Sequence, residues 1–269
     1  MAQGIGERNR RLLDLLHRKA SGPFTAEEAS KVLSLEHRRT ARFLRYLAER
    51  GWLSRIRRGV YTTVPLGATN PSAWREDAWV VAARLFSPCY IGGWSASEHW
   101  SLTEQVFRAV VVMTARPVRL SSVDVQDQPF RLKHISRRKL FGSSTEWRGR
   151  VRINVSDPSR TIVDILDDPA IGGGMRHGAT VLAEYWTSSH RDEMLLLEYA
   201  RRLENRTVFK RLGFLLEELE IHAPTLVAAC FENRSSGISA LDPTVKRKGR
   251  IVKRWNLRVN VSLHDANAR

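Results

Sequence analysis

Arginine side chains recur through residues 36–64 at spacings that suit recognition of nucleic acid. An arginine near the start of a helix in the major groove can pair with guanine through two hydrogen bonds, worth roughly 1–3 kcal/mol of discrimination. Arginines on a hairpin more often meet phosphate or the minor groove, and they add affinity and salt dependence without reading the sequence. The candidate DNA-binding residues are His37, Arg38, Arg39, Arg42 and Arg45 in a predicted helix, and Arg55, Arg57 and Arg58 in a predicted hairpin.

The helix that would present the first five of these residues follows from apolar spacing. Thr40, Phe43, Leu44, Leu47 and Ala48 recur at helical intervals within residues 36–50 and leave the arginines on other faces. A left-handed glycine that follows is a common end for a helix, and the next residue is glycine. We therefore predict a recognition helix over this range.

Two earlier helices and a later hairpin complete the predicted unit. Residues 8–19 carry a leucine stripe, and Thr25 with Glu28 forms a capping-box pattern that starts a helix ending near residue 33. Residues 52–57 and 60–64 alternate with period two around Arg58-Gly59, which indicates a hairpin. The order helix, helix, turn, helix and hairpin is that of a winged helix-turn-helix.

The net charge also favours a polyanionic partner. The 269 residues carry a formal charge of +16, and residues 1–64 hold 14 Lys and Arg against 6 Asp and Glu, or +8. Nucleic acid is the first partner this suggests, and an anionic membrane surface the second. The sequence has no signal peptide and no twenty-residue apolar run. We expect a soluble, cytoplasmic protein that does not engage a membrane.

A proline-flanked polar segment suggests where the first domain ends. We predict a winged helix-turn-helix domain at residues 1–64, a linker at 65–73 and a second domain at 74–269. The fold class is α+β, with the winged unit followed by a larger mixed α/β domain. Beyond the linker, helices are expected at 74–86, 95–100 (with a serine cap), 157–168, 175–186, 192–203 and 206–220, and strands at 90–93, 106–113, 118–125, 130–135, 151–155 and 250–262.

Enzyme chemistry is the main rival class of function. A restriction-type nuclease needs an acid followed by a Glu/Asp-x-Lys pair, but Asp124 and Asp127 precede Arg131-Leu132-Lys133, which lacks the acid. Glu98-His99 has no second metal ligand at helical spacing, and the glycines at 172–174 lack the Lys-Ser/Thr of a phosphate-binding loop. We predict no catalytic residue, no metal site and no cofactor, and keep a DNA-targeted nuclease as an alternative.

Two basic clusters lie outside the winged unit. Residues 131–152 hold eight Lys and Arg against one acid, and residues 234–258 hold another eight against one acid. They are either solvated loops and strand edges or a second nucleic-acid surface, where nearby aromatic side chains could stack on bases. The candidate residues of this second surface are Arg137, Arg138, Lys139, Lys246, Arg247 and Lys248.

Several motifs together resemble a known family. They are Arg58-Gly59-Val60-Tyr61, the stretch 90–105 with its Ser-Ala-Ser-Glu-His-Trp-Ser-Leu-Thr run, the strand end at 113–116, and Asp157-Pro158-Ser159-Arg160-Thr161-Ile162-Val163-Asp164. In this combination the chain resembles the AbiEi antitoxins of the AbiE type IV toxin-antitoxin systems, from residue 8 to about residue 186.

The resemblance implies a phage-defence antitoxin with two tasks. Its winged helix would repress its own operon by binding repeats in double-stranded promoter DNA. Its C-terminal antitoxin domain would counteract a nucleotidyltransferase toxin without forming a stable complex with it. The alternative is a winged-helix transcriptional regulator whose C-terminal domain binds a ligand or a partner.

Overall fold

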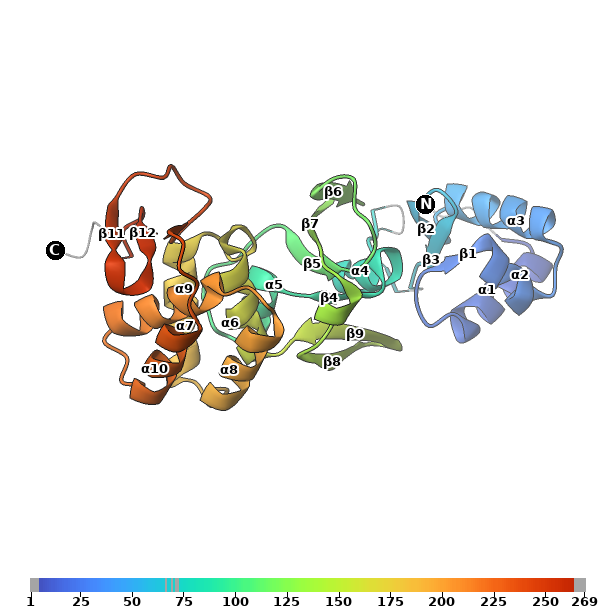
Figure 1. Ribbon diagram of the computed structural model, residues 1–269. Coiled ribbons are helices and arrows are strands. Elements are labelled where there is room, and N and C mark those ends of the chain that lie inside the picture. The colour runs from blue at the N-terminus through green and yellow to red at the C-terminus, as the bar shows by residue number, and fades with distance from the viewer. Residues whose placement is uncertain (1–4, 66, 69, 71–72, 264–269) are drawn as a thin grey trace.

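The computed structural model describes residues 5–65, 67–68, 70 and 73–263. The chain is elongated, with a winged unit at one end, a mixed sheet in the middle and a helical unit with a small sheet at the other end (Figure 1). The predicted fold class, a winged helix-turn-helix followed by a larger α/β part, is confirmed.

The winged unit follows the predicted order of elements. Its elements are α1 (Glu7–Lys19), β1 (Phe24–Thr25), α2 (Ala26–Leu33), α3 (His37–Glu49), β2 (Leu53–Arg57) and β3 (Val60–Thr63). The capping box is present, because Glu28 N donates to Thr25 Oγ1 at 3.3 Å and Thr25 N donates to Glu28 Oε2 at 2.7 Å. Gly51 follows α3 with φ of +76°, as expected for a residue that ends a helix. Leucines from all three helices form the core of the unit.

The predicted linker lies partly outside the described residues, because positions 66, 69, 71 and 72 are not described. On either side of it the chain has separate hydrophobic cores. The wing joins the two, since Ile56 and Val60 are buried in the core of the central sheet although they belong to β2 and β3. The division at residues 65–73 therefore stays a prediction.

The central sheet has the order β6-β7-β5-β4-β9-β8. β5 runs parallel to β7 and β4 parallel to β9, whereas the other neighbours are antiparallel. Val112 faces the core that includes α4, and Val111 and Met113 face the other side with Trp94 of α5. The strands are β4 (Cys89–Ile91), β5 (Val110–Thr114), β6 (Ser122–Val125), β7 (Gln128–His134), β8 (Ser143–Arg148) and β9 (Val151–Ser156), and the helices are α4 (Ala78–Phe86) and α5 (Gly93–His99).

Several predicted boundaries in this part are wrong. α4 begins at Ala78 rather than at residue 74, because the Asp77 carboxylate caps it by accepting from Trp79 N at 2.8 Å and Val80 N at 3.1 Å. Ser95 does not cap α5, since it lies inside the helix and its hydroxyl accepts from Val111 N at 3.0 Å. β5 and β6 begin four residues later than predicted, at 110 and 122 instead of 106 and 118.

The helical unit contains α6 (Pro158–Asp167), α7 (Met175–Thr187), α8 (Glu193–Arg202), α9 (Thr207–Glu218) and α10 (Pro224–Asn233). A small sheet of order β10-β12-β11 covers it, built from β10 (Ser239–Ala240), β11 (Arg250–Val252) and β12 (Leu257–Val259). Single 3-10 turns are η1 (Arg137–Lys139), η2 (Pro169–Ile171) and η3 (Lys253–Trp255).

The predicted last strand, 250–262, is wrong as a single element. It is a hairpin of β11 and β12 interrupted by η3, which directs Trp255 into the helical core. A Cβ atom at Gly213 of α9 would lie 2.1 Å from the Trp255 ring, so only glycine leaves room for it. The indole Nε1 donates to Glu217 Oε2 at 2.6 Å. The hairpin is therefore anchored to α9.

Candidate nucleic-acid interface

The α3 helix separates its basic residues from the core. Thr40, Leu44 and Leu47 are buried against the rest of the winged unit. Helical geometry places residues i, i+4 and i+7 along one line, so Arg38, Arg42 and Arg45 share the opposite side. His37 and Arg39 lie to the two sides of that line, and all five predicted residues are exposed. The structure thus brings the predicted helix residues together on one solvent-facing surface.

The start of α3 is held by a side chain of its own sequence. Glu36 is the N-cap, and its carboxylate accepts from Arg38 N at 3.1 Å and Arg39 N at 3.3 Å. These bonds occupy two backbone donors of the first turn, the turn that enters the major groove in this class of fold. The first turn is therefore fixed before any DNA is bound.

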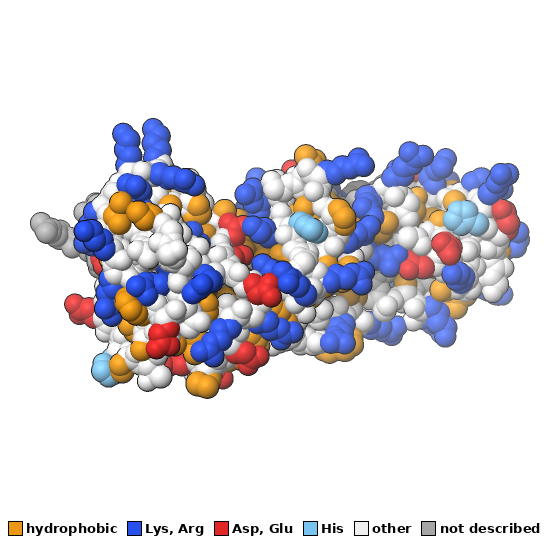
Figure 2. All heavy atoms as spheres, viewed as in Figure 1, with side chains coloured by type: hydrophobic (Ala, Val, Ile, Leu, Met, Phe, Trp, Pro, Cys, Tyr) orange, Lys and Arg blue, Asp and Glu red, His pale blue; other side chains and the backbone are white. Residues whose placement is uncertain are grey.

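The α3 arginines lack the ion pairs that three basic residues of α1 and α2 form. On α1 and α2, Arg11, Arg18 and Lys31 each form an ion pair with an acid one turn away, at 2.6 to 3.1 Å. Within the described residues, Arg38, Arg42 and Arg45 form no ion pair. No ion pair among the described residues neutralises these three arginines, so their charge can attract phosphate. Figure 2 shows Lys and Arg side chains gathered over the region that α3 occupies in Figure 1.

The wing presents the other three predicted residues. Arg55, Arg57 and Arg58 are exposed, while Ile56 between them is buried. Gly59 has φ of +79°, the left-handed conformation that the turn requires. None of the three arginines forms an ion pair with another described residue.

The wing is fixed to the central sheet rather than free. Gln126, in the turn between β6 and β7, donates from Nε2 to Ser54 Oγ at 2.8 Å, and Ser54 Oγ donates to the Trp74 carbonyl at 3.3 Å. Thr62 Oγ1 on β3 donates to Glu76 Oε2 at 2.5 Å. Together with the buried Ile56, these contacts set the position of the wing relative to α4 and the sheet.

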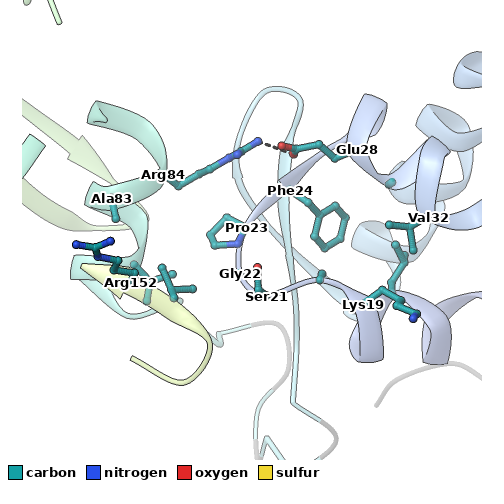
Figure 3. Close-up of a pocket in the computed structure, with 15 residues that line it drawn as sticks. Lys19, Ser21, Gly22, Pro23, Phe24, Glu28, Val32, Ala83, Arg84 and Arg152 are labelled. Carbon is teal, nitrogen blue, oxygen red and sulfur yellow. Dashed lines mark hydrogen bonds and ion pairs between the residues drawn. The ribbon is translucent and has the colours of Figure 1, made fainter. Parts of the chain in front are cut away.

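A second contact joins the opposite side of the winged unit to the sheet. Arg84 of α4 pairs with Glu28 of α2 at 2.5 Å across a cavity of about 340 Å³, as Figure 3 shows. Burial alone would raise the pKa of Glu28. The hydrogen bond from Thr25 N and the Arg84 guanidinium together have the larger, opposite effect, so the pKa lies below its ordinary value. Arg150 Nη1 also donates to the Arg18 carbonyl at 2.7 Å.

Part of the 157–164 motif lies in a buried polar cluster that sequence reasoning did not predict. Arg160 and Asp164, both in α6, are 0 % and 1 % exposed. Arg160 Nε donates to Asp164 Oδ1 at 2.9 Å, and the Tyr90 hydroxyl donates to Asp164 Oδ2 at 2.9 Å. The Arg160 guanidinium lies 4.0 Å from the centre of the Phe141 ring. Burial raises the pKa of Asp164, although Arg160 opposes that shift. The cluster joins α6 to β4, so its role is structural.

A signal for this cluster was present in the sequence. Arg160 and Asp164 are spaced i, i+4 in a helix whose other positions are almost all apolar or small. An oppositely charged pair at that spacing can bury both charges, because each neutralises the other.

The residues proposed for the second surface lie in two segments. Arg137, Arg138 and Lys139 form η1, and Arg138 pairs with Glu204 at 2.8 Å. Lys246, Arg247 and Lys248 lie in the exposed segment between β10 and β11. Arg247 lines a cleft together with Asn205, and Glu204, the partner of Arg138, directly precedes Asn205. Both segments therefore reach the turn between α8 and α9.

The side chains considered for nuclease chemistry have separate partners. Asp127 pairs with Arg75 at 3.1 Å, whereas Lys133 pairs with Asp168. Among other histidines, which could in principle bind a metal, His177 hydrogen-bonds Thr103 Oγ1 at 2.9 Å and the Gly172 carbonyl at 2.6 Å. Within the described residues no group of three or more His, Cys, Asp or Glu could hold a metal ion. None of the described helices has the length and apolarity needed to cross a bilayer.

Comparison with known proteins bears on the first unit and on the fold. A family model described as "Transcriptional regulator, AbiEi antitoxin" matches residues 10–64. No curated protein matches the chain. The crystal structure of RV2827C protein from Mycobacterium tuberculosis is similar, with a TM-score of 0.64 and 15% identity, and the match covers 95% of this chain and 92% of that one. At this identity the likeness concerns the fold, while the N-terminal unit resembles a transcriptional-regulator domain of the AbiEi antitoxins.

Proposed function

We propose that this chain is a cytoplasmic, DNA-binding autorepressor and the antitoxin of a type IV toxin-antitoxin system that acts in phage defence. One observation carries the DNA-binding part. The side of α3 opposite its core presents three arginines without ion pairs among the described residues, in the unit that matches the AbiEi transcriptional-regulator model. A surface of this kind attracts DNA and can read guanines.

The two parts of the winged unit take different roles in this proposal. The first half of α3, with His37, Arg38, Arg39 and Arg42, enters the major groove and reads base edges. Arg45 and the wing arginines contact phosphate and set the salt dependence of binding. The core that α3 shares with the wing strands, which includes Leu44, Leu53 and Tyr61, keeps these two contacts in a constant relative position.

The antitoxin part rests on the family likeness. The region after the linker, residues 74–269, would counteract a nucleotidyltransferase toxin without a stable complex. The basic segments that reach the α8–α9 turn, Arg137 to Lys139 and Lys246 to Lys248, are the surface we propose for it. The promoter DNA bound by the winged unit would contain repeats.

A paired assay tests both tasks in the same cells, with a promoter reporter for repression and growth rescue for antitoxicity. Arg42→Ala should weaken binding to the operon's own promoter by roughly 5- to 150-fold, since a base-contacting arginine is worth about 1–3 kcal/mol. It should weaken binding to random DNA less. Arg11→Ala is the matched control, because Arg11 is exposed on α1 and already paired with Glu7.

Equal loss by Arg42→Ala on promoter and random DNA would contradict the assignment of base reading to α3. Failure of the unmodified chain to repress the reporter would contradict autorepression. Failure to rescue growth from the neighbouring nucleotidyltransferase would contradict the antitoxin role. Protein levels should be matched in every arm, so that loss of folded protein is not taken for loss of function.

A further inference from the structure

A basic cleft lies in the helical unit, at the opposite end of the molecule from the winged unit (Figure 1). It has a volume of about 550 Å³ and opens between the start of α9 and the segment that carries β10. Arg211, Arg247 and Arg258 line it, and Asp167 is its one acidic lining residue among those described. Three positive charges against one negative charge leave the cleft with a formal excess of two.

Two of the three arginines that line the cleft, Arg247 and Arg258, are available to a ligand. Arg247 has no hydrogen bond or ion pair with any described residue, and Arg258 donates only a long bond of 3.4 Å, to the Gly249 carbonyl. The one acid, Asp167, accepts a hydrogen bond at Oδ1 from the amide of Asn205, which also lines the cleft, at 2.6 Å. Asp167 can offset only part of the charge of the three arginines, so the cleft keeps an excess of positive charge.

Lys210, buried next to the cleft, adds to this charge, and the lining residue Arg211 is buried as well. Lys210 is 0 % and Arg211 5 % exposed, yet their side-chain partners are neutral. Lys210 Nζ donates to the Gly237 carbonyl and to Ser239 Oγ, and Arg211 donates to the carbonyls of residues 166, 167, 240 and 241. Burial lowers the pKa of Lys210, and the adjacent Arg211 and Arg234 lower it further.

Buried charges without a counter-charge are rare because removing them from water is unfavourable. Here no described carboxylate forms an ion pair with Lys210 or Arg211, although the nearby carboxylates of Asp167, Asp168 and Asp242 oppose the lowering of the Arg211 pKa by burial. An anion in the cleft would supply negative charge next to both. Arginine binds phosphate through two parallel N–H donors, and Arg247 and Arg258 both have free donors for such contacts.

The cleft also has an apolar side. Ile238 is 57 % exposed and lines the cleft together with Pro243. An exposed isoleucine beside a group of arginines suits a ligand that carries both a phosphate and a flat apolar part, because the two kinds of surface can be covered at once. Nucleotides have this combination, whereas inorganic phosphate satisfies only the arginines.

We propose that this cleft binds the phosphate groups of a nucleotide, with Arg247 and Arg258 as the direct contacts and Ile238 beside the base. The site shares Arg247 with the second basic surface and gives that surface a class of ligand. It does not depend on DNA binding by α3. The nucleotide is either free in solution or part of a single-stranded nucleic acid, and the two sources share the phosphate chemistry that the cleft recognises.

Titration calorimetry of the full chain tests the proposal. The probes are ATP, inorganic pyrophosphate, adenosine and a short single-stranded RNA without terminal phosphate. ATP and pyrophosphate should bind, and adenosine should bind at least 10-fold more weakly than ATP. Arg247→Glu should weaken ATP binding by roughly 10- to 100-fold, the effect of losing charge-assisted hydrogen bonds. Arg258→Glu should act in the same direction.

Lys248→Glu is the matched control. It makes the same change of net charge in the same exposed segment, but Lys248 does not line the cleft. We expect it to weaken ATP binding less than about threefold, which is the scale of a screened surface charge. Operator binding through α3 should be unchanged in both variants, so a failure here is distinct from a failure of the DNA-binding proposal.

Two results would overturn the site. One is that no phosphate-bearing probe binds the unmodified chain at millimolar concentration. The other is an equal loss in the Arg247→Glu and Lys248→Glu variants, because it would show a general charge effect in place of a cleft. RNA binding without ATP binding, lost only in Arg247→Glu, would support the site and assign the phosphate to a nucleic-acid strand.

Discussion

Removing the positive charge of the wing should change the salt dependence of DNA binding in a predictable way. The perturbation is the triple variant Arg55→Gln, Arg57→Gln and Arg58→Gln. All three side chains are exposed and form no ion pair with another described residue, so their removal should leave folding unchanged. The buried Ile56, which anchors the wing, is kept.

The magnitude follows from counterion release. Each phosphate contact contributes about −0.9 to the slope of log K against log salt concentration. Three lost contacts should therefore make the slope shallower by about 2.7. Raising salt from 50 to 200 mM changes log concentration by about 0.6. Over this range the affinity of the unmodified chain should fall by a factor about 40 times larger than the factor for the variant.

The assay is fluorescence anisotropy with the operon's promoter and with a random duplex, each at four or more salt concentrations. The matched control is the triple variant Arg11→Gln, Arg18→Gln and Lys31→Gln. It removes three charges from the same unit, but each is already paired with an acid on its own helix. The control slope should change by less than about 1.

A wing variant whose slope equals that of the unmodified chain would show that the wing does not contact phosphate. An equal change in wing variant and control would show that net charge alone sets the slope. Either result would refute the division of roles between α3 and the wing. Melting temperatures of both variants should be measured first, so that unfolding does not contribute to the slopes.

Three further predictions concern stability and domain structure. Asp164→Asn should destabilise the chain by about 3–5 kcal/mol in denaturant unfolding, because it leaves the buried Arg160 charge without its partner; a loss under 1 kcal/mol would contradict this. Burial lowers the pKa of His17 below 6.5, so the unfolded chain binds more protons and stability should fall as pH drops below about 6.5. His17→Leu should flatten this part of the stability curve, and an unchanged curve would exclude His17 as the cause. Residues 74–269 should unfold cooperatively on their own, because the core of the helical unit lies wholly within them and the sheet core loses only Ile56 and Val60 of its buried residues; an aggregated fragment would place the boundary elsewhere.

The winged unit could be predicted because its signals are local. The capping box of Thr25 and Glu28, the helical spacing of the apolar residues and Gly51 after α3 each depend on neighbours within a few residues. Local signals of this kind hold wherever the segment packs. The same reasoning placed the α6 start at Asp157 and Pro158.

Other elements could not be predicted because distant residues decide them. β8 was missed, since it is an edge strand with mostly exposed or half-buried side chains and so has no apolar face. The hairpin of β11 and β12 alternates like one strand, and only the space left by Gly213 explains why η3 interrupts it. α10 was also missed, although Pro224 begins it at the position that helices tolerate best.

The candidate site divides in the same way. The exposed face of α3 follows from helical spacing alone, so its residues could be predicted. Arg211 could not, because its burial depends on carbonyl groups about thirty and forty-five residues away. Of the six residues proposed for the second surface, Arg247 lines the basic cleft, and Arg138 is paired with Glu204 at its edge.

The placement of the two basic surfaces decides how independent their roles can be. The α3 face is backed by the core of the winged unit, whereas the basic cleft is backed by the separate core around Trp255 and α9. The central sheet lies between them, with its own core. An exposed arginine on either surface can therefore be changed without disturbing packing behind the other. Because exposed charges more than about 10 Å apart are largely screened in 0.1 M salt, the field of one surface also contributes little at the other. DNA binding at one end and phosphate binding at the other can then be gained or lost separately, unless a ligand moves the sheet that holds the wing.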